Sequence, residues 1–283
     1  MTLSIDSFAG LSLIDSTKAE KSRDAGKFLI HGPQGTGKTH LASTLAQCGP
    51  MLYIDLVGEH GTGSFAGEPY AENIYVARPK SVTELDDIYW QLDSGDHPFV
   101  AVAIDSLSAL QKMVMRFMMG HSETAVREIK QGAKPATFGT WGEALNVMTD
   151  TVTFWYGLAA GDRPNPIHVA MTAQTKVTES DDSGVISRNP DVQKGALQIT
   201  LAAPDYVIYT DLEPDDDSYS EDGPAFRHIA RFGADTDYRT KAIIPAPLRG
   251  RLPSILGRKG SPDLSQLVKI LGMAGAQPRK TKK

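Results

Sequence analysis

The sequence predicts an α/β fold in which a mainly parallel sheet lies between layers of helices, with antiparallel strands added late in the chain. Two observations predict this class. Short, almost wholly apolar runs have the length and composition of parallel strands buried on both faces, and they occur at residues 28–30, 51–57, 99–105 and 167–174. Segments with the apolar spacing of helices lie between these runs, as crossover connections require.

Composition narrows the class of protein further. The chain has 283 residues, 41% hydrophobic and 22% charged, which is typical of a globular protein with one large or two small domains. No apolar run approaches the roughly 18 residues of a membrane span, and the first residues lack the pattern of a signal peptide. The single cysteine, Cys48, excludes an internal disulfide framework and a cysteine-based zinc cluster. We therefore expect a reducing, cytoplasmic setting and no membrane partner.

Charge is distributed unevenly along the chain. The net charge is −5, but residues 211–222 alone carry seven acidic side chains and no basic one. The remainder has 29 basic and 27 acidic residues, and the tail at 279–283 is strongly basic. We expect the acidic tract to form a solvated loop and the tail a disordered end. Charge thus neither supports nor excludes a nucleic-acid partner.

The most informative stretch is a glycine-rich turn that follows the first apolar strand. Residues 32–39, GPQGTGKT, fit the pattern G-x-x-x-x-G-K-[ST], and an amphipathic helix follows. Gly35 and Gly37 permit backbone amides to converge on a phosphate, while Lys38 can reach the β- and γ-phosphates and Thr39 can hold Mg²⁺. This phosphate loop predicts nucleotide binding, with ATP and Mg²⁺ as the expected ligands. The candidate nucleotide-binding residues are Gly32, Pro33, Gln34, Gly35, Thr36, Gly37, Lys38, Thr39 and His40.

A second acidic landmark follows the apolar run at residues 99–105. This run ends in Asp105, so its carboxylate is expected at the sheet edge where ligands bind. In enzymes with a phosphate loop such an acid holds Mg²⁺, usually through water. The alternative is that Asp105 only caps the following helix.

The remaining elements are expected in the following order. Residues 1–25 are a polar lead-in with an apolar patch, which forms an edge strand, covers the core, or docks on a neighbouring protomer. Strands, helices and polar loops then alternate: a strand at 73–77, a helix at 81–92 with Ser81 and Glu84 as a capping box, a methionine-rich helix at 107–119, a polar loop at 120–140, a helix at 141–160, a long polar loop at 175–195, a hairpin of strands at 205–210 and 226–232, a proline-punctuated segment at 235–251, and a terminal helix at 261–271. The expected division is a lead-in at 1–24, a core at 25–257, and a C-terminal helix with a basic tail at 258–283.

The order of these landmarks resembles the RecA/RadA recombinase core over roughly residues 25–250. Residues 102–110, VAIDSLSAL, look like the family's Mg²⁺ strand, and residues 194–210 look like the segment after its second DNA-binding loop. The compact length is similar to the minimal RecA-like ATPases of bacteriophages, the Sak-type single-strand annealing proteins, often labelled phage nucleotide-binding AAA proteins. The resemblance implies a RecA-like P-loop NTPase core. It further implies an ATPase that depends on single-stranded DNA (ssDNA), assembles as a ring or filament in recombination or annealing, meets a single-strand DNA-binding protein, and works in the cytoplasm of a bacterial host.

The resemblance also implies roles for individual residues. Lys38, Thr39 and Asp105 would bind phosphate and Mg²⁺, and Gln174 would be the switch glutamine that senses the γ-phosphate. Arg239 and Lys241, close together on an expected late strand, look like the basic pair that reaches a neighbour's ATP.

One departure from the family concerns the glutamate that orients water. The family places it where this chain has Val57, so we expect Glu59, two residues further on, to take the role, with Asp55 a poor substitute.

Contact with ssDNA is expected from the two polar loops. Aromatic side chains would stack on bases and basic side chains would meet phosphates, through Phe138, Trp141, Lys130, Lys134, Lys176, Arg188 and Lys194. The alternative is that these are ordinary solvated loops, with Trp141 in the core.

Two other functions stay open at this stage. One is a P-loop switch or motor that acts on a protein partner, such as a helicase loader or a clock-type ATPase. The other is a small-molecule kinase. The small number of arginines near the phosphate loop counts against a kinase. A phosphate loop alone does not decide among them.

Overall fold

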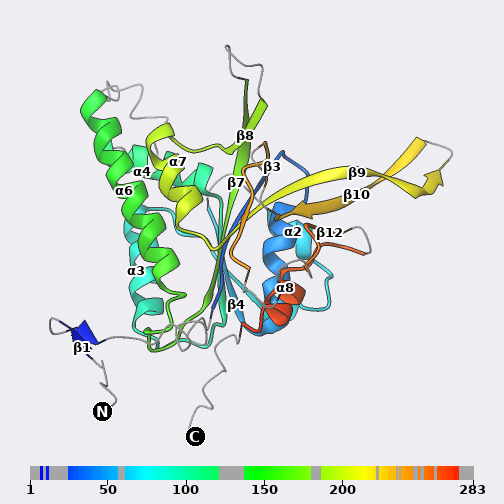
Figure 1. The fold of residues 1–283 in the computed structure, drawn as a ribbon. Coiled ribbons are helices and arrows are strands. Elements are labelled where there is room, and N and C mark those ends of the chain that lie inside the picture. The colour runs from blue at the N-terminus through cyan, green and yellow to red at the C-terminus, as the bar shows by residue number, and fades with distance from the viewer. Residues whose placement is uncertain are drawn as a thin grey trace, which may run out of the picture.

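The computed structural model describes residues 7–8, 11–12, 25–56, 61–120, 137–179, 186–220, 223–233, 235, 237–244, 248, 252–257 and 260–273. Within these residues, one sheet of ten strands forms the centre of the molecule, and its main path runs in the order β12-β10-β9-β3-β7-β6-β4-β5 (Figure 1). Its strands are β3 (Lys27–Gly32), β4 (Met51–Asp55), β5 (Ile74–Ala77), β6 (Ala101–Asp105), β7 (His168–Glu179), β8 (Ile186–Pro190), β9 (Tyr206–Ser220), β10 (Gly223–Arg231), β11 (Lys241–Ala242) and β12 (Ile255–Leu256).

Helices cover both faces of this sheet, which confirms the predicted fold class. One face packs against α3 (Val82–Asp93), α4 (Leu107–Met118), α6 (Phe138–Gly157) and α7 (Lys194–Ala202). The other face packs against α2 (Lys38–Ser43), α8 (Leu264–Ile270) and the 3₁₀ segments η1 (Thr44–Cys48) and η2 (Gly61–Phe65), while η3 (Ala71–Asn73) lies against η1. Among the described residues, no helix combines the length and apolar character that crossing a membrane needs.

The parallel strands bring four sequence-distant positions to one edge of the sheet. Gly32 of β3 is in register with Gln174 of β7, and Asp55 of β4 is in register with Asp105 of β6. Because β3, β4, β6 and β7 are parallel, their carboxyl ends meet at this edge, where the ligands of open α/β sheets bind.

The prediction of a long polar loop at residues 175–195 is wrong. Strand β7 continues beyond the sheet to Glu179, pairs antiparallel with β8, and is followed by helix α7. The segment forms strands because β-branched residues such as Thr175 and Val177 alternate along it, and because pairing with β8 satisfies its backbone. The resulting β7–β8 hairpin projects from the sheet edge in Figure 1.

The acidic tract is also not the loop that its composition predicted. The expected late hairpin is confirmed, but β9 extends through most of the tract to Ser220, so that β9 and β10 form a long arm (Figure 1). Arginines on β10 pair with acids on β9, Arg231 with Glu213 at 2.8 Å and Arg227 with Asp215 at 3.5 Å. These cross-strand pairs offset the repulsion between the acidic side chains. The segment therefore does not need to form a solvated loop to keep its acids apart.

Three smaller expectations differ from the structure. In the lead-in, β1 (Ser7–Phe8) and β2 (Leu11–Ser12) pair with each other in a separate small sheet rather than at the edge of the main sheet. Helix α6 begins at Phe138, earlier than expected, while most of the predicted loop at 120–140 lies outside the described residues. Arg239 occupies a turn with a φ of 51° rather than a strand.

Candidate functional site

The phosphate loop connects β3 to α2 in the conformation that its glycines allow. Gly35 and Gly37 have φ angles of 79° and 88°, in the left-handed region that other residues adopt only with strain. Gly32 is required for a different reason, since a Cβ atom there would lie 2.2 Å from Oγ1 of Thr210 on β9. The loop is therefore packed between its own helix and the start of the β9–β10 arm.

Lys38 is buried inside this loop and connects it to the neighbouring strand. Its Nζ donates to the carbonyl oxygens of Gly32 at 3.0 Å and Pro33 at 2.7 Å, and to Oε1 of Gln174 at 3.3 Å. The residue predicted to bind phosphate and the residue predicted to sense it are thus in direct contact. Gln174 lies in β7 just before this strand continues into the projecting hairpin.

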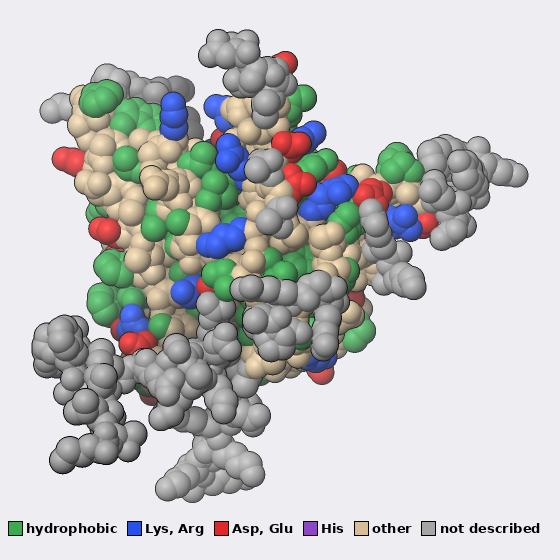
Figure 2. All heavy atoms as spheres, in the orientation of Figure 1, with side chains coloured by type: hydrophobic (Ala, Val, Ile, Leu, Met, Phe, Trp, Pro, Cys, Tyr) green, Lys and Arg blue, Asp and Glu red, His purple; other side chains and the backbone are tan. Residues whose placement is uncertain are grey.

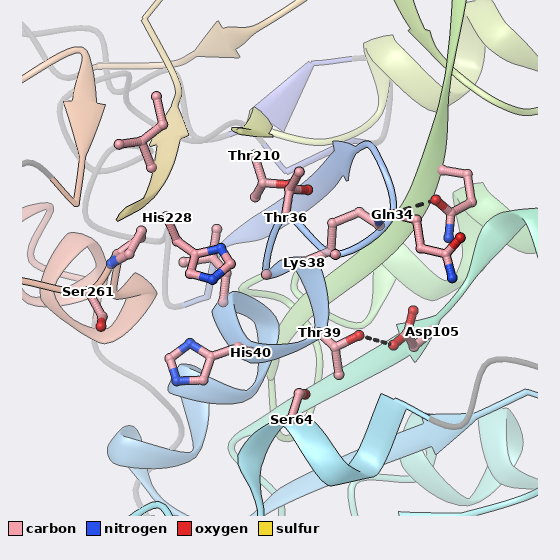
Figure 3. A pocket seen from close by; sticks show the side chains of 16 residues that line it. Gln34, Thr36, Lys38, Thr39, His40, Ser64, Asp105, Thr210, His228 and Ser261 are labelled. Carbon is pink, nitrogen blue, oxygen red and sulfur yellow. Dashed lines mark hydrogen bonds between the residues drawn. The ribbon is translucent and has the colours of Figure 1, made fainter. Parts of the chain in front are cut away.

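Asp105 lies at the end of β6, buried beside the loop. Its Oδ2 accepts a hydrogen bond from Oγ1 of Thr39 at 2.6 Å, as Figure 3 shows, and a second one from the Tyr53 hydroxyl. Its Oδ1 accepts from the hydroxyl of Thr172. Ser106, not Asp105, caps α4, because the Ser106 side chain accepts from the Ala109 amide.

The donor set at this point fits a magnesium ion that is shared with phosphates. Among the described residues, no group of three or more His, Cys, Asp or Glu side chains could hold a metal by itself. Mg²⁺, however, usually binds to one or two protein oxygens and completes its shell with substrate phosphates and water. The hydroxyl of Thr39 and the carboxylate of Asp105, side by side at the loop, would supply such oxygens.

Tyr53 and Thr172 are functional candidates that the sequence analysis missed. Both side chains are fully buried, on β4 and β7, the strands that flank β6. Burial and the neighbouring charge of Asp105 raise the pKa of the Tyr53 hydroxyl well above its usual value, so this hydroxyl keeps its proton and donates. Their spacing from Asp105 in the sequence gave no signal, since only the strand order brings the three together.

Of the two candidate acids near β4, only Asp55 lies in the described part of the chain. Glu59 lies outside the described residues. Asp55 is buried and accepts a hydrogen bond from Nε of Arg78 at 2.8 Å, so an arginine offsets its charge. This pairing occupies one oxygen of the Asp55 carboxylate.

A cavity of about 450 Å³ opens beside the phosphate loop, a volume suited to a small organic ligand. Its lining comes from the loop and α2, from Asp105 at the end of β6 and Gln174 within β7, and from segments that the sequence did not link to the site: Ser64, Thr210, His228, Ile229, Ser261 and Pro262. In Figure 3, His40, His228 and Ser261 lie at one side of the loop and Asp105 lies at the other. His228 is close to the loop, since a Cβ atom on Gly37 would be 3.2 Å from its Nδ1.

The expected basic pair lies away from this cavity. Nζ of Lys241 donates to the carbonyl oxygens of Ala202 and Pro204, both at 2.7 Å, and burial lowers its pKa. Those carbonyls precede β9, whose first residue pairs with Phe28 near the start of β3, opposite the phosphate loop. Arg239 is exposed in its turn. Neither residue is among those that line the cavity.

The candidate DNA-contacting residues separate into three groups. Lys130 and Lys134 lie outside the described residues. Phe138 is 98% exposed and Trp141 is 42% exposed at the start of α6, so the alternative that places Trp141 in the core is wrong. Lys176 and Lys194 are exposed, whereas the guanidinium of Arg188 lies 4.7 Å from the ring centroid of Tyr238.

Arg188 and Lys176 occupy opposite faces of the β7–β8 hairpin. Val177 pairs with Arg188, while Lys176 pairs with Asn189, and neighbouring pairs in an antiparallel ladder point to opposite sides. Lys176 and Arg188, both predicted to contact the same nucleic acid, are therefore not on one surface. Lys176 remains on the face of the hairpin opposite to Tyr238.

A comparison with models of protein families agrees with the phosphate loop. A family model described as an AAA domain matches residues 24–241. No protein with a curated description matches the sequence. Among solved structures, the flagellar accessory protein FlaH from Methanocaldococcus jannaschii is 11% identical with a TM-score of 0.33, covering 77% of this chain and 84% of that one. The P4 protein from bacteriophage phi6, in complex with ADP, is 15% identical with a TM-score of 0.28; the match covers 71% of this chain and 57% of the phage protein.

Proposed function

The chain belongs to the AAA domain family of P-loop ATPases, and we propose that it hydrolyses ATP with Mg²⁺ in order to act on ssDNA. The proposed setting is recombination or single-strand annealing of the phage Sak type, in the cytoplasm of a bacterial host. The proposed ATPase core is residues 25–257, followed by a C-terminal helix and tail.

The observation that carries this proposal is the contact between Lys38 and Gln174. The Lys38 ammonium lies where it would meet phosphate, and Gln174 belongs to the strand that runs on into the β7–β8 hairpin. When phosphate draws Lys38 away from Gln174, β7 loses a hydrogen-bond partner at the point where it leaves the parallel sheet. A change at the nucleotide would in this way reach the projecting hairpin through one continuous strand.

In the proposed reaction, each residue at the sheet edge has one task. Lys38 neutralises phosphate charge, and the Thr39 hydroxyl and the Asp105 carboxylate hold the Mg²⁺ shell in place. Bound Mg²⁺ supplies a positive charge that stabilises the phosphate oxygens. Glu59 is the proposed residue that orients the attacking water, because Asp55 is paired with Arg78. Arg239 and Lys241 would act on the nucleotide of a neighbouring protomer, so that hydrolysis depends on assembly into a ring or filament.

The proposed ssDNA surface lies between the β7–β8 hairpin and the start of α6. It combines the exposed aromatic side chains of Phe138 and Trp141, which can stack on bases, with the exposed Lys176 and Lys194, which can meet phosphates. Figure 2 shows Lys and Arg side chains around the β7–β8 hairpin on one face of the molecule. Arg188 is not included, because its guanidinium packs on Tyr238. A single-strand DNA-binding protein is a further proposed partner.

A second candidate is an ATPase switch that acts on a protein, and one surface feature favours it. Trp90 on α3 and Phe154 on α6 are 65% and 56% exposed, and both rings lie against Tyr89, at centroid distances of 5.2 and 6.2 Å. Large exposed aromatic side chains that are grouped together are typical of protein-binding surfaces.

The deciding experiment is an ATPase assay of the wild type and Lys38→Ala, with and without ssDNA, at two salt concentrations. We expect ssDNA to stimulate the wild type, the stimulation to weaken as salt rises, and Lys38→Ala to be inactive throughout. Hydrolysis by the wild type that is indifferent to ssDNA would favour the protein-directed switch. Phosphoryl transfer to an added metabolite instead of water would identify a kinase.

A further inference from the structure

Three hydroxyl groups from three different elements converge on the carboxylate of Asp105. Thr39 comes from α2, Tyr53 from β4 and Thr172 from β7. Thr39 and Tyr53 donate to Oδ2 and Thr172 donates to Oδ1, so both oxygens are held. A carboxylate has about four lone-pair sites, and three of them are used here.

These hydroxyls take the place of a cationic partner. Asp105 is buried, with 3% of its surface exposed, and no ion pair among the described residues includes it. The neighbouring carboxylate, Asp55, has Arg78 instead. A buried carboxylate without a cationic partner needs hydrogen bonds to remain stable. Hydroxyl groups supply these bonds, and, unlike a lysine or arginine, they do not compete with a metal ion for the carboxylate's charge.

The three donors are not equivalent in position. Thr39 belongs to the phosphate loop, and its hydroxyl is the one that would turn toward Mg²⁺ when nucleotide binds. Tyr53 and Thr172 are fully buried within the sheet, and the ring of Tyr53 packs edge-on against Phe65 at 5.1 Å. Their hydroxyls therefore stay with Asp105 when Thr39 leaves.

We propose that Tyr53 and Thr172 are positioning residues that hold the Asp105 carboxylate toward the metal and thereby set the affinity of the site for Mg²⁺. This inference rests on the proposed binding of Mg²⁺ and ATP. It separates the tasks of the hydroxyls, because Thr39 would contact the metal whereas Tyr53 and Thr172 act only through Asp105.

The test removes each hydroxyl while leaving the shape of its side chain. A fluorescent ATP analogue is titrated into the full chain at rising Mg²⁺ concentrations and, in parallel, in EDTA. We expect Tyr53→Phe and Thr172→Val each to raise the Mg²⁺ concentration at half-maximal tight binding by about 10-fold, the effect typical of losing a partner of a metal-ligating carboxylate. Binding in EDTA should stay within about twofold of the wild type, since neither hydroxyl would touch the nucleotide.

Tyr156→Phe is the matched control. Its hydroxyl is equally buried and donates to the Phe28 carbonyl at 3.1 Å, outside the residues that line the cavity. We expect this variant to lose thermal stability like Tyr53→Phe but to keep the wild-type Mg²⁺ requirement.

Two results would overturn the inference. One is an unchanged Mg²⁺ requirement in Tyr53→Phe or in Thr172→Val. This result counts if the variant is folded, with an unfolding temperature near that of Tyr156→Phe. The other is an equal loss of binding in EDTA and in Mg²⁺, which would mean general damage to the pocket. If the wild type binds the analogue under neither condition, the proposed function fails, and this inference fails with it.

Discussion

Two histidines lie on the inner strands of the sheet without contact with solvent. His31 on β3 shares a hydrogen bond of 3.0 Å with Thr175, and His168 on β7 accepts from the Gly26 amide at 2.8 Å. Burial lowers the pKa of His31 to about 3 and that of His168 to about 4, and the charge of Lys38 also lowers the pKa of His31. Both imidazoles therefore stay neutral in the folded protein at neutral pH.

These depressed pKa values predict a loss of stability in mild acid. Between pH 6.5 and pH 4, the unfolded chain binds a proton at residue 168 that the folded chain does not, so stability falls as pH falls. Urea denaturation should show that the wild type loses about 2 kcal/mol more than His168→Asn between pH 8 and pH 5. Parallel pH profiles for the two proteins would contradict the depressed pKa.

For single residues, the sequence was sufficient where the role depends on residues nearby in the chain. The phosphate loop and Asp105 could be identified because a local pattern or the end of an apolar strand marks each of them. Tyr53, Thr172 and His228 could not, because they reach the site only through strand order and pairing. The role of Glu59 stays a prediction, since it lies outside the described residues.

Among the elements, the β9–β10 arm shows how pairing can override composition. Seven acids in a short segment predicted a solvated loop, yet the arginines on β10 allow the segment to remain a strand. The arm also brings Thr210 and His228 against the phosphate loop, so it is part of the cavity as well as a projection.

The place of His228 in the arm leads to a prediction about ligand binding. His228 lines the cavity with Ser261, away from Asp105, where the nucleoside part of ATP would lie if Lys38 holds its phosphates. We expect His228→Ala to weaken ATP binding about fivefold, as for the loss of one ring contact of about 1 kcal/mol, and to leave tripolyphosphate binding unchanged. Calorimetric titration with both ligands measures this difference.

Phe226→Ala is the control for this experiment. Phe226 is exposed on the same strand and does not belong to the cavity lining. An equal loss of affinity for ATP and for tripolyphosphate in His228→Ala would show that the histidine acts on the loop and not on the nucleoside.

For the whole molecule, the alternation of apolar strands and amphipathic helices was enough to predict the layered fold. The course of β7 beyond the sheet was not predictable, because residues 175–179 are polar except for Val177, and their partner strand begins only at Ile186. Yet this course decides which surfaces share an edge. It sets a hairpin beside the nucleotide cavity and turns Lys176 and Arg188 to opposite sides.

Lys176 allows DNA binding at the hairpin to be tested separately from ATP binding in the cavity. Lys176 lies two residues after Gln174, exposed on the side of the hairpin opposite to Tyr238. If it contacts a DNA phosphate, Lys176→Glu should weaken ssDNA binding at all sequences and lower the slope of log affinity against log salt by about 1. Fluorescence anisotropy with a labelled oligonucleotide measures both, and ATP binding should not change.

Lys269→Glu, a charge reversal on α8 across the sheet, is the control and should leave the slope unchanged. Equal effects of the two reversals would mean that only net charge matters, and the hairpin would then have no place in the DNA surface.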